Sequence, residues 1–538
     1  MGSYDTLYEA FKIFVSNVIY HKQSLSTPRY LQRRSSFSQK KFQRQSSFVN
    51  TSEDQFSDHT VVFTVEEALL KSTSLFPFFM LVAFEAGSPL RAMVMLAMYP
   101  LVCLMRKEWG LKLMIMVAFF GINKESFYKV GRSVMPKFFL EDTGLEGLEV
   151  LKKFKRKVAY SHMPRVMVES FLREYVKVDH VVGCEIKEFR GYFIGLVEDN
   201  NSTVDLKKIT GEEEMSSKVI GMCGSRRSLQ NLVFSACKEI HVIRRAERKA
   251  WTTLPKEKYL KPLIFHDSRL VSKPTPSSTI AVLMWLPFAF FLFILRTLCF
   301  VFLPPNVARP ILCFSGCRVL FSEAKSTKPS ETVTNDTKQK GLLYVCNHRT
   351  LSDPVYLKMA LDKNVTALTY SLSKMSELIS PIRTARLTRN RERDAAKMEK
   401  LLSEGNVAVC AEGTTCREPY LLRFSPLFAE MSDVIVPVAL DTSFTMFYGN
   451  TAGGYKFLDP VFFLMDPHPS YTIQLLEKVK GLATCQYHDG AEVAASKFEL
   501  ANRVQAEIGH ALGFECTMLT RKDKYLILAG NDGSVRSK

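Results

Sequence analysis

The sequence predicts an α/β protein of several domains with a membrane-associated segment, and three observations support this fold class. A chain of 538 residues exceeds what one hydrophobic core usually accommodates, so two or three domains are expected. Short β-branched runs alternate with helical stretches in both halves of the chain. Between the halves lies a long apolar run beside linker-like sequence.

In the first half, ordered structure is expected to begin near His59. Apolar, β-branched runs predict strands at residues 60–65, 157–160, 181–183 and 192–197. Apolar helical stretches are expected at 75–84, 93–105 and 111–120. Each is shorter than the ~20 residues needed to cross a bilayer alone. They are therefore either core helices or interfacial ones, and the sequence leaves both readings open.

The middle of the chain carries the membrane prediction. A Pro- and Ser-rich stretch at 271–278 has the composition of a linker. Residues 280–295 hold no charge and reach ~24 Å as a helix, less than the ~30 Å hydrocarbon core. Continuing the helix to Leu303 gives enough length if Arg296 extends its charge to the membrane surface. Pro287 also permits a broken, re-entrant helix, and a buried core helix is the remaining alternative.

The second half predicts another α/β domain after a polar linker at 322–340. Strands are expected at 342–346, 407–410 and 434–439, with helices at 355–360 and 394–402. The expected organisation is therefore a basic, disordered arm (1–58), a first domain (59–270), a linker and membrane-associated segment (271–321) and a second domain (322–538).

Charge and composition indicate the partners. A net charge of +18 favours an anionic partner: nucleic acid, an anionic membrane face, or small phosphorylated substrates. Phe occurs 39 times against 3 Trp, often in apolar runs, which favours a bilayer over nucleic acid. The arm has no acidic residue between Ala10 and Ser52, so it either contacts anionic headgroups or is a mitochondrial transit peptide. The 12 cysteines lack zinc-ligand spacing and indicate a reducing, cytosol-facing environment.

The strongest chemical signal is His348 followed by Asp353. On one continuous helix the two side chains would point about 140° apart and could not meet. Asp353-Pro354 predicts a helix start with Asp353 as the N-cap, so that His348 lies in the preceding loop and can fold back. A carboxylate on one ring nitrogen fixes the tautomer and lets the other accept a proton from a substrate hydroxyl.

Two further stretches predict anion binding. Glu412-Gly413-Thr414 follows a strand and opens a turn of small residues, whose backbone N–H groups can hold an anion, and Arg417 in the same loop can bind phosphate bidentately. The cationic run 383–389, with Arg386 and Arg389, is either a phosphate or coenzyme A contact or a solvated surface.

These motifs resemble a known family. Asn347-His348-Arg349-Thr350-x-x-Asp353, Arg386-Leu-Thr-Arg389, Glu412-Gly413-Thr414 and Val436-Pro437-Val438 are similar, in order and spacing, to the four blocks of glycerolipid acyltransferases. Stretches 369–373, 412–428 and 523–530 resemble more closely the land-plant glycerol-3-phosphate sn-2 acyltransferases.

The resemblance implies transfer of an acyl group from acyl-CoA, as co-substrate, to the sn-2 hydroxyl of glycerol-3-phosphate, without metal or other cofactor. His348 and Asp353 would be catalytic, with Gly413 as a candidate oxyanion donor. The substrate-binding candidates are Arg349, Arg386, Arg389, Glu412, Gly413, Thr414 and Arg417. The setting implied is a lipid bilayer of the endoplasmic reticulum and the synthesis of plant surface polyesters such as cutin and suberin, with no nucleic acid partner.

The first domain resembles that family's haloacid-dehalogenase-like (Rossmannoid) phosphatase domain but departs from its motifs. Thr64 stands where active members have the nucleophilic Asp, and Arg226-Arg227 fall where an acidic motif would hold magnesium. Ser161 still fits the second phosphatase motif. The phosphatase is therefore predicted to be inactive, and the product, lysophosphatidic acid, keeps its phosphate.

Three alternatives remain open at this point. A bifunctional enzyme that also removes the phosphate would need a carboxylate at position 64. A lysophospholipid acyltransferase would share the His–Asp block. A non-catalytic lipid-binding scaffold would have no need of His348, Asp353 and Glu412 together.

Overall fold

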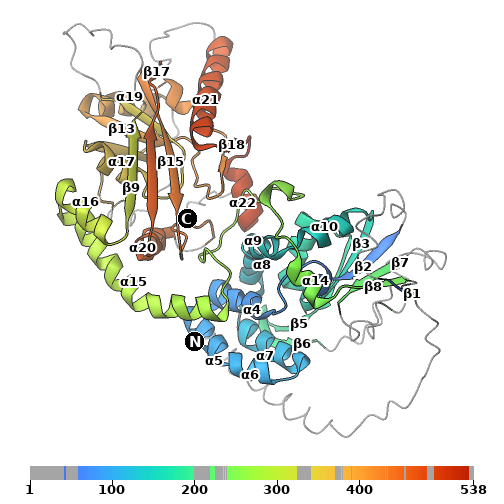
Figure 1. The fold of residues 1–538 in the computed structure, drawn as a ribbon. Coiled ribbons are helices and arrows are strands. Elements are labelled where there is room, and N and C mark those ends of the chain that lie inside the picture. Colours follow the sequence, from blue (N-terminus) through green and yellow to red (C-terminus); the bar gives the residue numbers. More distant parts are fainter. Residues whose placement is uncertain are drawn as a thin grey trace. The chain divides into compact units, whose positions relative to one another are not determined.

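The computed structural model (Figure 1) describes residues 41–43, 59–198, 219–224, 234, 237, 239–323, 341–369, 377, 380–388, 391–430, 432, 434–453, 456–480 and 490–531. Most of the basic arm lies outside the described residues, as do Arg226, Arg227 and Arg389. Two compact units form: one of residues 1–263 and 273–279, the other of 264–272 and 280–538.

This division differs from the expected boundaries at residues 264–272 and 273–279, the second of which belongs to the first unit. Residues 264–272 belong to the second unit, although the sequence places most of them at the end of the first domain. The physical reason is their bonding, because Leu270 forms a β-bridge with Phe447 and Arg269 pairs with Asp459 at 2.6 Å.

The first unit is built on a parallel sheet. Its strand order is β1 (Lys41–Gln43), β8 (Glu239–Val242), β7 (Val219–Cys223), β2 (Thr60–Thr64), β3 (Arg156–Pro164) and β4 (His180–Cys184). Every residue of β2 is buried, as expected for a central parallel strand covered on both faces. A separate hairpin pairs β5 (Ile186–Phe189) with β6 (Tyr192–Val197). The four strand predictions of this half are confirmed.

The helices of the first unit differ in exposure. They are α3 (Val65–Ala68), α4 (Phe76–Val82), α5 (Pro89–Ala97), α6 (Tyr99–Leu104), α7 (Lys107–Phe119), α8 (Lys124–Ser133), α9 (Met135–Asp142), α10 (Leu145–Lys152), α11 (Arg165–Phe171) and α14 (Arg245–Ala250), with π-helical turns η2 (Ala83–Gly87) and η3 (Leu172–Val176) and the 3-10 turn η6 (Lys256–Lys258). All residues of α4 are buried, so it is a core helix. In contrast, α6 has no buried residue.

The second unit contains the other sheet. Its order is β12 (Thr384–Arg386), β11 (Val365–Thr369), β13 (Asn406–Cys410), β10 (Leu343–Cys346), β15 (Val434–Ser443), β16 (Ser470–Leu475) and β9 (Arg318–Glu323), and β17 (Val479–Lys480) also pairs with β15. From β12 to β15 neighbouring strands are parallel, and β16 is antiparallel to β15. The predicted strands at 342–346, 407–410 and 434–439 are confirmed. Functional groups are expected beyond the carboxyl ends of β10 and β13.

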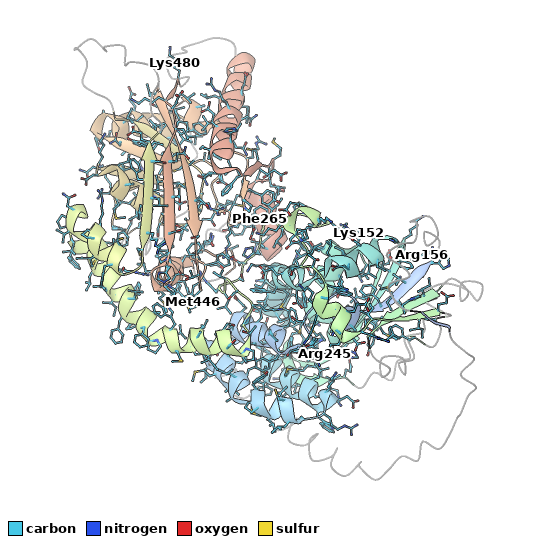
Figure 2. The ribbon with its side chains drawn as sticks, viewed as in Figure 1. Lys152, Arg156, Arg245, Phe265, Met446 and Lys480 are labelled. Atoms are coloured by element: carbon cyan, nitrogen blue, oxygen red, sulfur yellow. The ribbon has the colours of Figure 1, made fainter. Side chains whose placement is uncertain are left out.

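Helices and short elements complete this unit. They are α16 (Pro305–Phe314), α17 (Asp353–Leu361), α19 (Arg391–Glu404), α20 (Asp459–Met465), α21 (Gly490–Leu512) and α22 (Arg521–Ala529), the 3-10 turns η7 (Pro426–Glu430) and η8 (Lys456–Leu458), and the short pair β14 (Tyr420–Leu421) and β18 (Glu515–Cys516). The long helix α21 packs against β15 and η7, and Figure 1 shows it beside β15. Phe265, labelled in Figure 2, packs with Cys416 and Leu422.

The apolar middle segment forms α15 (Pro276–Phe302), one continuous helix of 27 residues that includes Pro287. Its length of about 40 Å and its apolar composition suit a membrane crossing. Among the described residues it is the one helix that is both long enough and apolar enough to cross a membrane. The helix is continuous through Pro287 and few of its residues are buried, so the alternatives of a re-entrant break and of a buried core helix are wrong.

The expected surface position of Arg296 is wrong. Its side chain is fully buried and donates to the carbonyls of Leu464 and Asp466, both at 2.7 Å, and to Ser315. Arg296 therefore attaches α15 to the end of α20 instead of extending to the membrane surface.

Candidate active site

The candidate site lies where β10 and β13 end side by side. The register pairs Cys346 with Cys410, so the residues after these strands meet at one edge of the sheet. Asn347, fully buried, donates to the carbonyl of Leu440 and accepts its N–H, both at 2.8 Å. These two hydrogen bonds to β15 fix the chain immediately before His348.

His348 folds back onto Asp353 as predicted. The Nδ1 atom of His348 lies 2.8 Å from Oδ2 of Asp353, whose side chain is fully buried. The same carboxylate accepts the N–H groups of Arg349 at 2.6 Å and Thr350 at 2.9 Å, and the hydroxyl of Tyr471 at 2.8 Å. Asp353 is thus held rigidly, and Nε2 of His348 is the ring nitrogen left for a substrate.

The predicted N-cap role of Asp353 is wrong by one position. Helix α17 begins at Asp353, and Ser352 is its N-cap. The carboxylate of Asp353 binds the loop that precedes the helix, because the backbone N–H groups of residues 349 and 350 point toward it.

A thiol, which the sequence did not single out, also lies near His348. Sγ of Cys410 is within 4.8 Å of a ring nitrogen of His348 and 3.9 Å from Sγ of Cys346. Burial alone lowers the pKa of His348, but Cys410 and Asp353 outweigh it and hold that pKa well above 6.5. Ligand atoms of His348, Asp353 and Cys410 lie within 4.8 Å of one another, a spacing that could hold a metal ion. The oxygens of Asp353, however, already accept several hydrogen bonds.

Glu412 binds the protein itself and not an open pocket. Its Oε1 accepts the N–H of His348 at 2.7 Å, and its Oε2 accepts the N–H of Leu422 at 2.9 Å. Burial raises the pKa of Glu412 to about 7. With both oxygens occupied, Glu412 positions the His348 backbone, and its expected contact with substrate is not supported.

Gly413 is needed for its backbone conformation. Its φ of 66° lies in the left-handed region, which favours glycine. Its N–H donates to the carbonyl of Cys410 at 3.2 Å, so the expected role of this N–H as an oxyanion donor is wrong. In the same turn, the N–H of Cys416 donates to the carbonyl of His348 at 2.8 Å, which joins the turn to the catalytic loop.

Arg349 is mainly a structural residue. Its buried guanidinium donates to the carbonyls of Cys416 and Glu418 at 2.9 Å and pairs with Asp441 at 2.9 Å. Only its Nε is buried without a hydrogen-bond partner among the described residues. Most of its donors are therefore unavailable for the phosphate contact that the sequence suggested.

Arg417 is wholly committed to protein partners. Its Nε donates to Oδ1 of Asn450 at 2.5 Å, one terminal nitrogen donates to the Ser268 carbonyl at 2.7 Å, and the other lies 3.6 Å from Asp267. The same terminal nitrogen donates to the Asn450 carbonyl. The predicted bidentate grip on phosphate is therefore wrong, because Arg417 instead holds residues 264–272 in place.

Arg386 lies at the surface of the second unit. It ends β12, its side chain is 45% exposed, and it forms an ion pair with Glu377 at 3.0 Å. A surface ion pair of this kind contributes little to stability. Arg389, the other member of the predicted pair, lies outside the described residues.

Lys524 on α22 is a site residue that sequence reasoning missed. Its buried Nζ lies 3.0 Å from the hydroxyl of Thr415 and 3.4 Å from that of Thr414. Burial lowers the pKa of Lys524 to about 8. A small polar cavity beside it is lined by Ile264, Phe265, His266, Asp267, Thr415, Arg417, Asn450, Thr451 and Lys524. In the sequence, Lys524 is part of the stretch 523–530, which indicates the family but no role for this side chain.

The first unit carries a second cluster at the end of β2. The hydroxyl of Thr64 is buried and has no hydrogen-bond partner among the described residues. Three donors meet on Oε1 of Glu66: the Ser161 hydroxyl at 2.6 Å, the His162 N–H at 2.8 Å and the Met163 N–H at 3.1 Å. The only residue of the phosphatase pattern that the sequence retained, Ser161, thus binds an internal carboxylate.

Known families match both units. Residues 60–243 match the family described as glycerol-3-phosphate acyltransferase RAM2-like, HAD-like domain. Residues 327–441 match the family described as acyltransferase. These matches agree with the fold class predicted from the sequence for each part.

Full-length plant proteins are similar to the chain. Probable glycerol-3-phosphate acyltransferase 2 of Arabidopsis thaliana is 51% identical over 90% of this chain and 91% of its own length. Probable glycerol-3-phosphate acyltransferase 3 of the same plant is also 51% identical, over 94% and 96%. Glycerol-3-phosphate acyltransferase RAM2 of Petunia hybrida is 38% identical over 88% and 98%.

Proposed function

Because the chain belongs to the plant glycerol-3-phosphate acyltransferase family, we propose that its second unit takes the acyl group from acyl-CoA and transfers it to the sn-2 hydroxyl. The observation that carries the mechanism is the 2.8 Å contact between His348 and a rigidly held, buried Asp353. The reaction uses no metal and no cofactor beyond the acyl donor, since a thioester is already activated.

The proposed reaction uses this geometry as follows. Nε2 of His348 removes the proton from the glycerol hydroxyl, whose oxygen attacks the thioester carbonyl. The resulting oxyanion needs N–H donors, for which the backbone of Thr414 and Thr415 is the candidate now that Gly413 is bonded to Cys410. The intermediate collapses, the C–S bond breaks, and the coenzyme A thiolate recovers the proton from His348.

Phosphate recognition is proposed for a smaller set of residues than the sequence suggested. Arg386 is exposed at the end of β12, and Arg389 follows it in the chain. Lys524 supports the turn at Thr414 and Thr415 from within the protein. The phosphate itself stays on the product, because Thr64 offers no carboxylate nucleophile and Glu66 fills the anion-binding donors of the first unit.

The proposed location is the membrane of the endoplasmic reticulum, with α15 in contact with the bilayer. Support comes from the length and composition of α15. A mitochondrial location would instead require the basic arm to act as a transit peptide. A fluorescent fusion lacking residues 1–50 distinguishes the two, because only a transit peptide would change the location on removal.

The decisive assay uses microsomes from a host that lacks the activity. Labelled glycerol-3-phosphate and acyl-CoA are supplied to the wild type, to His348→Ala and to His510→Ala, a matched loss of an exposed histidine on α21. The wild type and His510→Ala should form the 2-acyl lysophosphatidic acid, and His348→Ala should form none.

Three other results would contradict parts of the proposal. A monoacylglycerol product, with endogenous phosphatases inhibited, would show that the first unit still removes phosphate. A strong preference for lysophosphatidic acid as acceptor would favour the lysophospholipid acyltransferase alternative. Activity retained in His348→Ala would remove the proposed base.

A further inference from the structure

Helices α5 and α6 and the start of α7 present an unusually apolar surface. The following large side chains are each between 44% and 86% exposed: Leu90, Met93, Val94, Leu101, Leu104 and Trp109. Cys103 on α6 is exposed among them. We call these seven residues the α5–α6 surface. Single exposed apolar residues are ordinary, but a contiguous group of this kind marks an interaction site.

On α5 and α6 no exposed charge interrupts this surface. Between Pro89 and Met105 the single charged residue is Arg91. Its guanidinium turns inward and donates to the carbonyl of Ala118 at 2.8 Å. The part of the α5–α6 surface on these two helices therefore lacks the charged side chains of an ordinary solvated face.

The surface is not an unfinished core. Helix α4 is buried at every residue, and α5 buries only Ala92 and Met95. The scaffold beneath is tightly fixed, since a Cβ at Gly110 of α7 would meet the Val102 carbonyl of α6 at 3.3 Å. The outward apolar side chains are thus additional to those that stabilise the fold.

The rim of the surface is cationic. Arg106, Lys107 and Lys112 are exposed directly after α6, with Glu108 as the single exposed acid among them. Nζ of Lys112 lies 5.6 Å from the ring of Trp109. A Trp beside basic residues at the edge of an apolar surface is the arrangement found at the boundary between lipid headgroups and acyl chains. The cations complement anionic headgroups in particular.

We propose that the α5–α6 surface docks the first unit onto an anionic lipid bilayer. Helices of 9 and 6 residues are too short to cross a membrane, so they lie on it. The first unit, which has lost the residues of phosphatase chemistry, thereby has a retained use: it holds a lipid-forming enzyme on its membrane. This inference requires nothing of the acyltransferase mechanism and adds a contact separate from α15.

The native thiol of Cys103 provides the test. The purified full-length protein is mixed with vesicles of phosphatidylcholine and phosphatidic acid, and labelling by a water-soluble maleimide is followed by peptide mass spectrometry. Labelling of Cys103 should slow roughly tenfold or more when vesicles are added, because the thiol enters the headgroup–acyl boundary. Protection of this thiol, and not vesicle binding, is the readout, since α15 can hold the protein on a vesicle by itself.

Matched variants separate the surface from the rest of the unit. Leu101→Glu with Leu104→Glu places two charges on exposed positions and should abolish the vesicle effect at Cys103. Tyr128→Glu with Tyr192→Glu, at 48% and 44% exposed positions outside the surface, should leave it unchanged. Arg106→Gln and Lys107→Gln should each reduce the vesicle protection of Cys103 about fivefold at low salt. A cysteine placed at Tyr128 in a Cys103→Ser background should label at the same rate with and without vesicles.

Defined outcomes would overturn the proposal. Equal labelling of Cys103 with and without vesicles would exclude membrane contact. Protection of Cys103 in the absence of vesicles would show that protein, either a second copy or another part of this chain, covers the surface. Equal protection by pure phosphatidylcholine would remove the anionic part of the proposal.

Discussion

Two carboxyl groups near His348 contact different parts of this residue, one its ring and the other its backbone. Asp353 accepts a hydrogen bond from Nδ1 of His348 and stabilises the charged ring. Glu412, in contrast, accepts a hydrogen bond from the backbone N–H of His348 and not from its ring. Burial lowers the pKa of His348, but Cys410 and Asp353 together raise it above 6.5. Because the neutral ring is the working base, activity is expected to be lost as the pH falls through this raised pKa.

The first residue-scale prediction follows from this balance. Asp353→Asn removes the stabilising charge, so the pKa of His348 should fall and the acidic limb of kcat/KM should move to lower pH. The plateau should drop by at least about 10²-fold, because the tautomer and orientation are no longer fixed. Tyr471→Phe, which removes one donor to Asp353 but keeps the charge, should leave the limb much closer to that of the wild type. An unmoved limb in Asp353→Asn would assign it to another group.

Glu66 leads to a second prediction at this scale. Its carboxylate occupies the Ser161 hydroxyl and the N–H groups of His162 and Met163, which together would suit a phosphate oxygen. Thr64→Asp alone should therefore release no phosphate from the product in a phosphate-release assay. Glu66→Ala should instead gain a thermal shift with inorganic phosphate that the wild type lacks. A phosphate-induced shift in the wild type would show that the pocket is already open.

At the scale of elements, the sequence predicted what depends on local pattern. The strands around residues 60–65 and 342–346 are short apolar runs bounded by polar sequence, so their type and place were readable. Contacts between distant segments were not. Arg417 was expected to bind phosphate, but its partners Asp267 and Asn450 come from elsewhere in the chain. The prediction for Arg349 was wrong for the same reason, because its partners Cys416, Glu418 and Asp441 are distant in the sequence. For Gly413 the reason is local, because its N–H donates to the Cys410 carbonyl three residues earlier.

Arg296 gives the prediction at element scale. It is buried in α15 and donates to the carbonyls of Leu464, Asp466 and Ser315. Arg296→Met should leave these carbonyls buried without donors and cost about 3 kcal/mol or more. The melting temperature in detergent should fall accordingly. Thr297→Ala, which removes only a hydroxyl bonded to the Phe293 carbonyl within the helix, serves as control. Equal melting temperatures for both variants would mean that the carbonyls find other partners.

At the scale of the whole molecule, the chain passes between the two units more than once. Residues 264–272 belong to the second unit, 273–279 return to the first, and the remainder belongs to the second. The family match of the second unit begins only at residue 327 and therefore omits this segment. Two residues of segment 264–272, His266 and Asp267, nevertheless contact Glu418 and Arg417 in the loop beside the candidate site.

These contacts are numerous for a short segment. Asp267 accepts the N–H groups of Ala452 at 2.7 Å and Gly453 at 2.8 Å, and it lies near Arg417. Nε2 of His266 lies 3.1 Å from the carboxylate of Glu418, in the loop that follows the Thr414–Thr415 turn. Without the segment, buried charges of the second unit lose their partners, which usually costs several kcal/mol for each pair that is broken.

A truncation series tests this dependence on residues 264–272. Chains of residues 264–538, 273–538 and 322–538 would be expressed in the same host and compared for soluble yield in detergent, melting temperature and acyl transfer. The chain from 264 should fold and retain activity. The chain from 273 keeps all of α15 but none of the 264–272 contacts, so it should melt lower and lose most activity. The chain from 322 also lacks α15, α16 and most of β9 and should be the least stable. Equal behaviour of the chains from 264 and 273 would show that Asp267 and His266 do not support the site.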